Sequence, residues 1–538
     1  MLFARTVAVW LVVAFILGAS LGGASAASFT IDGSKTNQYV DGLGVNANYW
    51  SYTNHDLEPV LDALIDQAGM TLFRVVFNNG WEATNDNSDS TVMNQPYYNA
   101  LYAGPEFEKL WGLIGYLNQK GISNGIVLNF QGPGPNWMGG GSLTAGMEDE
   151  WAEMIVSLLA YARNNRQLQF NLVAPDNEPD IGGEGIYVAT AQQYVTMLEK
   201  LAAKLDANGL GDFRLVVPDR SNWTTNFFPE IMADPAIMAK VAHFGFHSYS
   251  GGGTDSAGVS QFVNSTAFAD RKTWVTEYNV WCESCERGGQ GTNGWDYFRE
   301  TADYLLDHLA NGASAGLVWE AYDSYYPHHN AWSFWGLFAV DSTNAIAKTY
   351  TPRKNFYTLA QISKFVRPGA RRIGLTGTQG PLWIDVFYHD ALGQLTLTGI
   401  NTSSNPQIFS GSLASLPSIA SLDFYYTSST TNLAQAASAA ITNHNFSLTV
   451  PPDCIFTLTG FDPARLLPPP VLTISQAGNS LTFSWPSVYT AHFLEMATNL
   501  NSLSQWTTVT NLRQTVGQEW QVNLSPTGAQ QFFRLRQQ

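Results

Sequence analysis

The chain has 538 residues, of which 45% are hydrophobic and only 13% are charged, so it is apolar enough to fold and is not a disordered protein. With 27 Lys and Arg against 44 Asp and Glu, the formal net charge is −17. This balance disfavours nucleic acids and polyanionic substrates, and it favours neutral, hydrogen-bonding ligands.

The N-terminal residues have the pattern of an export signal. Arg5 precedes an apolar run over residues 7–19, and Ala24-Ser25-Ala26 fits a small-residue cleavage site. The run is shorter than the roughly 20 residues that span a bilayer, which argues against the alternative of an uncleaved anchor. We therefore expect residues 1–26 to be a signal peptide and the protein to be secreted, extracellularly or into the periplasm.

Residues 40–365 alternate short apolar runs with helical patterns. The β-like runs cover 40–46, 72–77, 125–130, 170–174, 213–217, 241–246, 272–276 and 315–319, and helical patterns cover 57–68, 107–119, 151–164, 191–207 and 295–310. Eight apolar strands in this alternation predict a (β/α)8 TIM barrel of the α/β class. An open doubly wound sheet is the alternative, but no G-x-G-x-x-G motif supports it.

The remaining segments read as all-β. Residues 366–461 alternate in a strand-like way and, with residues 28–39, predict a side β-sandwich domain. Residues 462–470 form a Pro-rich linker, and residues 471–538 predict a small C-terminal all-β domain. Its aromatic residues either fill its own core or stack on a glycan, and the packing needs of so small a unit favour the core. Attachment to a cell surface or glycan through this domain stays open.

Two glutamates stand at the carboxyl ends of predicted barrel strands, where such barrels place catalysis. Glu178 follows the fourth strand, and Glu277 ends the seventh strand. Because these strands lie across the barrel mouth from one another, both side chains can converge on one bond. Hydrolysis of a glycosidic bond with retention uses two carboxyl groups about 5–5.5 Å apart.

The motifs around these glutamates resemble those of clan A retaining glycoside hydrolases. Asn177-Glu178-Pro179 and Thr276-Glu277-Tyr278 carry the clan pattern, and residues 135–138 and 356–369 are most similar to glycoside hydrolase family 30. The resemblance covers residues 28–460. It implies that Glu178 is the acid/base, that Glu277 is the nucleophile and that Asn177 binds the sugar 2-hydroxyl.

The same resemblance assigns further substrate-binding residues. It implies that Arg74, placed at the end of the second strand, lies beside the nucleophile, and that Tyr249 reaches the nucleophile by a hydrogen bond. Trp319 is expected to form the sugar-stacking platform in preference to the adjacent Glu320, and His247 has either a structural or a chemical role. Aromatic residues at or after strand ends predict an extended groove; among these, Trp137 and Trp281 are the binding candidates.

Cysteine and histidine usage indicates no metal and no cofactor. Cys282 and Cys285 are expected to form a small loop disulfide, and Cys454 to pack as a buried hydrophobic residue. His328 and His329 form a pair without further ligands at suitable spacing.

Together these features predict a secreted retaining β-glycosidase that cleaves a neutral β-glycan such as β-1,6-galactan, β-glucan or xylan. Residues 322–341 contain no Lys or Arg that could bind the carboxylate of a uronate substituent. Arg287, in the preceding loop, is the remaining candidate for that contact. The alternatives are an exo-acting β-glycosidase of the same clan and a non-catalytic carbohydrate-binding protein.

Overall fold

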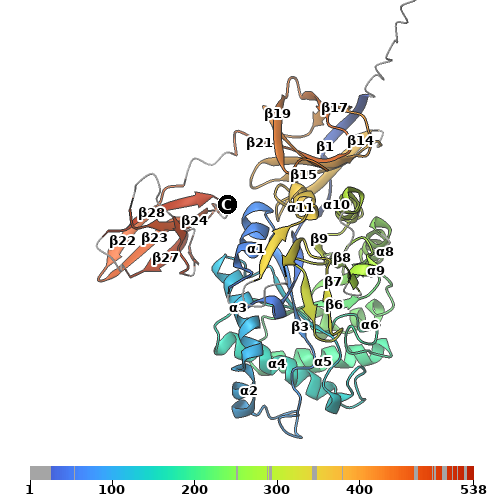
Figure 1. Cartoon of the computed structure of the whole chain (residues 1–538), viewed down its shortest axis with the longest axis vertical. Helices are drawn as coiled ribbons and strands as arrows, with labels where there is room; N and C mark the ends of the chain where they lie inside the picture. Colours follow the sequence, from blue (N-terminus) through green and yellow to red (C-terminus); the bar gives the residue numbers. More distant parts are fainter. Residues whose placement is uncertain are drawn as a thin grey trace, which may run out of the picture.

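The computed structural model contains a barrel, a second β domain above it and a C-terminal β unit at the side (Figure 1). It describes residues 26–537 apart from 54, 250–251, 287–288, 290–293, 342–347, 378–379, 466–469, 488, 490–491, 500–505, 512, 518 and 526–529. The expected signal peptide up to residue 25, Arg287 and linker residues 466–469 lie outside the described residues.

The barrel closes with eight parallel strands, and all eight predicted strands are confirmed. They are β2 (Gly42–Asn48), β3 (Leu72–Asn78), β4 (Ile126–Gln131), β5 (Leu172–Ala174), β6 (Arg214–Arg220), β7 (Val241–Ser248), β8 (Lys272–Tyr278) and β9 (Ala315–Val318). Their residues are almost all buried because the strands pack against helices outside and against one another inside.

Side chains of alternating residues fill the barrel in layers. Leu72, Trp274 and Leu317 belong to an apolar cluster of barrel-strand residues. Arg74, two residues after Leu72, lies inside β3 and not at the end of the strand as predicted. The polar layer that contains Arg74 therefore begins inside the barrel and leads to the mouth.

Helices cover the outside of the barrel (Figure 1). The predicted helical segments are confirmed as α1 (Glu58–Asp62) with η2 (Ala63–Gln67), α3 (Pro105–Gln119), α4 (Glu148–Asn164), α5 (Ala191–Ala207) and α10 (Trp295–Ala310). Further elements are η1 (Tyr49–Ser51), α2 (Gln95–Tyr102), η3 (Asn136–Met138), α6 (Phe228–Ala233), α7 (Pro235–Lys240), α8 (Gly253–Asn264), α9 (Glu283–Glu286) and α11 (Lys354–Ser363). None of the described helices has the length and apolar character needed to cross a membrane.

Two short hairpins extend the barrel after β9. They pair β10 (Ser324–Tyr326) with β11 (Ala331–Ser333) and β12 (Phe338–Asp341) with β13 (Thr349–Pro352). The side chain of Arg353 bonds to Asp323 at 2.7 and 2.8 Å, which fixes the base of this region.

The side domain joins the start and the later part of the chain, as predicted. Its hydrogen-bonded order is β19-β18-β21-β16-β15-β14-β1-β17-β20. The strands are β1 (Ala26–Tyr39), β14 (Arg371–Gly377), β15 (Leu382–His389), β16 (Gln394–Asn401), β17 (Gln407–Ala414), β18 (Ser421–Ser428), β19 (Ala434–Ala440), β20 (Asn445–Val450) and β21 (Cys454–Phe461). Phe409 of β17 packs on Phe456 of β21 although four strands lie between them in the sheet, so the sheet folds over into a sandwich around one core. Cys454 is buried in that core, as expected.

The C-terminal unit has its own core. Its two sheets are β22 (Thr473–Ala477), β23 (Ser480–Pro486), β27 (Glu519–Leu524) and β26 (Gln514–Val516), and β25 (Thr507–Thr508), β24 (His492–Ala497) and β28 (Phe532–Gln537). Phe483 and Trp485 are buried between the sheets, and Trp520 and Phe533 pack against them. The large rings thus stabilise the unit itself.

Candidate active site

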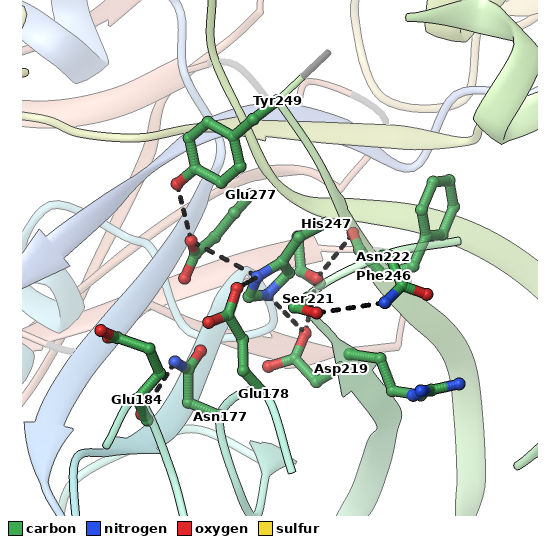
Figure 2. A network of polar contacts seen from close by, with 12 residues as sticks. Asn177, Glu178, Glu184, Asp219, Ser221, Asn222, Phe246, His247, Tyr249 and Glu277 are labelled. Carbon is green, nitrogen blue, oxygen red and sulfur yellow. Dashed lines mark hydrogen bonds and ion pairs between the residues drawn. The ribbon is translucent and has the colours of Figure 1, made fainter. Parts of the chain in front are cut away.

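Glu178 and Glu277 meet at the carboxyl end of the barrel (Figure 2). Glu178 follows β5 with a φ of 42°, and Glu277 is the penultimate residue of β8. A Cβ atom at position 185 would lie 1.6 Å from the carbonyl oxygen of Asn177, so only glycine allows the loop to pass behind this motif. One carboxylate oxygen of each glutamate and a ring nitrogen of His247 lie within 4.8 Å of one another.

The fully buried Arg74 holds the polar layer beneath these carboxylates. Its guanidinium donates to Glu277 at 2.6 Å, Asp219 at 2.8 Å, Asn177 at 2.6 Å and Asn46 at 2.8 Å. Burial alone would raise the pKa of Asp219, but the charge of Arg74, together with the contacts from His247 and Thr276, lowers it.

Sequence reasoning missed Asp219. It lies in β6, which extends to Arg220 and thus beyond the predicted end of the strand. Besides Arg74, its carboxylate accepts hydrogen bonds from the Thr276 hydroxyl and the Asn129 amide. The only signal in the sequence is a charged residue that directly follows an apolar run, because its partners come from other strands.

His247 connects the two glutamates. Its Nδ1 lies 2.7 Å from an oxygen of Glu178 and 3.5 Å from one of Glu277, and its Nε2 lies 3.6 Å from Asp219. Burial would lower the pKa of His247, but the charge of Glu277 and the contacts with Asp219 and Glu178 raise it to about 10. The ring is therefore an imidazolium at neutral pH and donates to Glu178.

The two glutamates differ in their electrostatic surroundings. Burial raises the pKa of Glu178 to about 7, against the lowering influence of the His247 hydrogen bond and charge. Glu277 instead accepts from Arg74 and, at 2.8 Å, from the hydroxyl of Tyr249. Burial keeps the phenol of Tyr249 neutral by raising its pKa, so this hydroxyl is a donor. Glu178 thus has a pKa at which a carboxyl group can both give and take a proton near neutral pH, whereas Glu277 is held by two hydrogen-bond donors.

A cavity of about 350 Å³ opens above these groups. Trp319, directly after β9, lines it, whereas the adjacent Glu320 is fully buried and accepts hydrogen bonds from Tyr326 and Ser333. The full lining is Gln131, Asn177, Glu178, Ile181, Glu184, Ser221, Tyr249, Glu277, Trp281, Glu286, Trp319, Tyr326, His329 and Ser333. Trp281 stands at the rim with 54% of its surface exposed.

The structure does not bring every predicted aromatic residue to the cavity. Trp137 is absent from the lining; its ring packs on the main core, and its Nε1 donates to the backbone oxygen of Glu82 at 2.7 Å. Trp335 is buried behind Tyr249 and Trp281. Position after a strand end alone therefore could not separate lining rings from packing rings.

The His328–His329 pair does have a further potential ligand, which corrects the expectation from the sequence. Oxygens of Glu184 lie 3.4 Å from Nε2 of His328 and 2.7 Å from Nε2 of His329. Burial would raise the pKa of Glu184, but the two histidine hydrogen bonds lower it to about 2. These three side chains have donor geometry compatible with a metal ion, yet they already pair with one another.

The loop after β8 carries the predicted disulfide. Cys282 and Cys285 are bonded, and both side chains are buried beside Trp319, Tyr326 and Trp335. The bridge lies immediately after Trp281 and fixes the start of α9 at the cavity rim.

Comparisons with known proteins find similarity to glycoside hydrolases. A sequence model of the glycosyl hydrolase catalytic core matches residues 146–310. The chain is 24% identical over 311 residues to the glucuronoxylanase XynC of Bacillus subtilis strain 168, covering 57% of this chain and 65% of that protein. The match therefore spans just under two thirds of the relative's length.

Solved structures show the same fold over most of the chain. A family 30 endoxylanase from Clostridium papyrosolvens superposes with a TM-score of 0.62 at 19% identity, covering 81% of this chain and 100% of that one. An endo-β-1,6-glucanase superposes with a TM-score of 0.60 at 16% identity, covering 81% of this chain and 94% of that one. The matches confirm the resemblance to clan A glycoside hydrolases of the family 30 type.

Proposed function

We propose that the protein is a secreted retaining β-glycosidase that hydrolyses a neutral β-glycan. The carrying observation is that oxygens of Glu178 and Glu277 lie within 4.8 Å of each other at one cavity. Inverting enzymes separate their carboxyl groups by about 6.5–9.5 Å to admit a water, whereas retaining enzymes use about 5–5.5 Å. This proximity supports a double displacement.

In the first step, the Glu277 carboxylate attacks the anomeric carbon while Glu178 donates its proton to the departing glycosidic oxygen. This forms a glycosyl ester on Glu277 and releases the leaving sugar as an alcohol. In the second step, Glu178 takes a proton from water, the water oxygen attacks the anomeric carbon, and Glu277 leaves as a carboxylate. A pKa near 7 lets Glu178 serve both steps.

The cavity wall suits a neutral sugar. Glu184 and Glu286 add acidic groups to the two catalytic carboxylates, and the described part of the lining contains no Lys or Arg. A uronate here would meet repulsion, whereas the faces of Trp319 and Trp281 offer stacking for pyranose rings. Xylan and β-glucan are the candidate polymers, since the similar proteins include xylanases and an endo-β-1,6-glucanase; β-1,6-galactan is the third candidate.

The test is reducing-sugar release from linear xylan, glucuronoxylan, β-1,6-glucan and β-1,6-galactan, with product sizes measured. We expect cleavage of a neutral polymer into short chains and no requirement for a uronate. Release of monosaccharides alone would favour the exo-acting alternative. Activity restricted to glucuronoxylan would contradict the neutral-substrate assignment, and no hydrolysis of any β-glycan would favour a non-catalytic binding protein.

A further inference from the structure

An acidic cluster lies away from the catalytic cavity, where the loop between β3 and α2 packs on α4. Glu82 and Asp86 come from the loop, and Glu150 and Glu153 come from the first turns of the helix. One oxygen each of Asp86, Glu150 and Glu153 lies within 4.8 Å of the others. Nothing in the proposed catalytic mechanism uses these groups.

The cluster contains buried oxygens that the described chain leaves without a partner. Glu153 is fully buried, and neither of its carboxylate oxygens has a hydrogen bond within the described residues. The same holds for Oδ1 of Asp86, although its Oδ2 accepts from the Asn87 side chain and the Asn94 backbone at 2.8 Å. The Asn85 side chain hydrogen-bonds Glu150, and its Oδ1 is also buried without a partner in the described residues. Such groups are costly to bury unless something binds them.

No cation of the described chain pairs directly with the three clustered carboxylates. Lys204 is the nearby one, but its ammonium donates to the backbone oxygen of Ser90 and lies 4.0 Å from Asp149, outside the cluster. Burial, together with the charge of Asp86, raises the pKa of Glu153 to about 8, and Glu82 behaves in the same way. The charge of Lys204 favours the ionised form of Glu153, but it does not outweigh burial and the neighbouring carboxylates.

We propose that Asp86, Glu150 and Glu153 bind a calcium ion, with Asn85 Oδ1 as a neutral ligand. An all-oxygen donor set selects a hard cation, and several carboxylates in an irregular arrangement suit Ca²⁺, which takes six to eight ligands, better than Mg²⁺, which demands octahedral geometry and retains water. The site departs from the sequence-based expectation of no metal.

The ion would fasten the long loop after β3 to α4. The loop lacks regular structure between the end of β3 at Asn78 and the start of α2 at Gln95. The backbone oxygen of Glu82 in this loop accepts a hydrogen bond from the indole of Trp137. Fixing the loop would therefore also stabilise the segment after β4 that contains Trp137. Binding to the folded state alone stabilises that state.

The alternative occupant of the cluster is a proton. Protonated Glu153 and Glu82 would remove the repulsion without any metal. This alternative predicts a protein whose stability does not respond to Ca²⁺ and in which a neutral amide at position 153 changes little.

Thermal unfolding of the full chain, first stripped with a chelator, distinguishes calcium binding from protonation of the cluster. We expect the Tm to rise by several degrees as CaCl2 is added up to about 10 mM and to rise less with MgCl2 at matched ionic strength. Glu153→Gln should abolish the rise, while Glu148→Gln, on the same helix and bonded only to the Gly146 backbone within the described residues, should keep it.

An unchanged Tm for the wild-type chain, or a full calcium response in folded Glu153→Gln, would overturn the proposal. If Glu153→Gln does not fold, Asp86→Asn serves in its place, because its amide preserves the side-chain size. Terbium luminescence on the wild-type chain gives a second readout. We expect one terbium ion per chain that Ca²⁺ displaces, and terbium emission indifferent to Ca²⁺ would also overturn the site.

Discussion

Glu178 and Glu277 share one cavity but have different neighbours, and these neighbours suit them to different roles in the proposed mechanism. Glu277 accepts from the permanent cation Arg74 and from Tyr249, so its negative charge is stabilised. Glu178 has one charged donor, His247, and is otherwise buried, which brings its pKa to about 7. In the proposed mechanism, these surroundings suit one glutamate to act as the nucleophile and the other as the proton donor.

Glu277→Gln tests the assignment of the nucleophile. The amide preserves the size of the side chain but cannot attack, so kcat/KM should fall by at least about 1,000-fold while the protein stays folded. Glu277→Ala with added azide should recover cleavage of an activated aryl β-glycoside and give a glycosyl azide of inverted configuration. Turnover near the wild-type level in folded Glu277→Gln would remove this residue from the mechanism.

The pH profile tests His247. Glu178 must carry a proton to start the reaction, so with its pKa at about 7 we expect kcat/KM to fall as the pH rises above 7. His247→Asn keeps a donor near the position of Nδ1 but removes the positive charge that lowers this pKa. The alkaline limb of the profile should therefore move to higher pH.

A matched control for that profile is His243→Asn. His243 also lies in β7, but it stacks on Trp274 at a centroid distance of 3.8 Å, and burial lowers its pKa to about 4. We expect the control to keep the wild-type profile. If folded His247→Asn keeps it as well, His247 does not set the protonation of Glu178.

At the scale of elements, we expect the loop between β8 and α10 to contribute to substrate binding. It presents Trp281 at the cavity rim and then forms the Cys282–Cys285 disulfide. Trp281→Ala removes a stacking surface without touching the reacting atoms. We expect KM to rise about fivefold, which corresponds to about 1 kcal/mol, with kcat nearly unchanged.

Trp383→Ala on β15 of the side domain is the matched control for this loop. Its ring is 53% exposed, almost the same as that of Trp281, but it does not line the cavity. Equal effects of the two substitutions on KM, or a loss of kcat alone in Trp281→Ala, would show that the loop does not act by stacking on the substrate.

The sequence predicted long, fully buried elements well and short or surface elements poorly. The eight barrel strands are continuous apolar runs because both of their faces are covered. Such a run can be recognised in the local sequence without knowing which strands lie beside it. Helices α6, α7 and α9 and the hairpins after β9 contain few residues, so a periodic pattern has no length in which to appear.

The candidate site shows the same division. Glu178 and Glu277 were found because each lies beside a motif at a strand end. Asp219 was missed because its place in the site depends on its ion pair with Arg74, which lies 145 residues away in the chain. Glu184 was missed for the same reason, since its histidine partners are 144 and 145 residues away.

At the scale of the whole molecule, we expect the C-terminal unit to be separable from catalysis. Its core is built from its own strands, and neither glutamate of the site lies in it. A chain that ends at Phe461 should therefore hydrolyse soluble oligosaccharides with nearly unchanged kcat/KM. A truncated chain that is folded by circular dichroism but inactive on them would contradict the separation.

Insoluble polymer distinguishes the two roles of this unit. Because Phe483 and Trp485 are buried, we expect its rings to serve packing, and the truncated chain should keep its activity on the polymer. A selective loss there would instead show that the unit binds glycan and raises the local substrate concentration.

The stereochemistry of the first product tests the central claim, that Glu178 and Glu277 act by double displacement, most directly. Proton NMR follows the reducing end during the first minutes of hydrolysis of a neutral β-glycan, before mutarotation mixes the anomers. Two successive inversions at the anomeric carbon should give the β-anomer first, with the α-anomer appearing only later. Initial formation of the α-anomer would show a single displacement and would contradict the account.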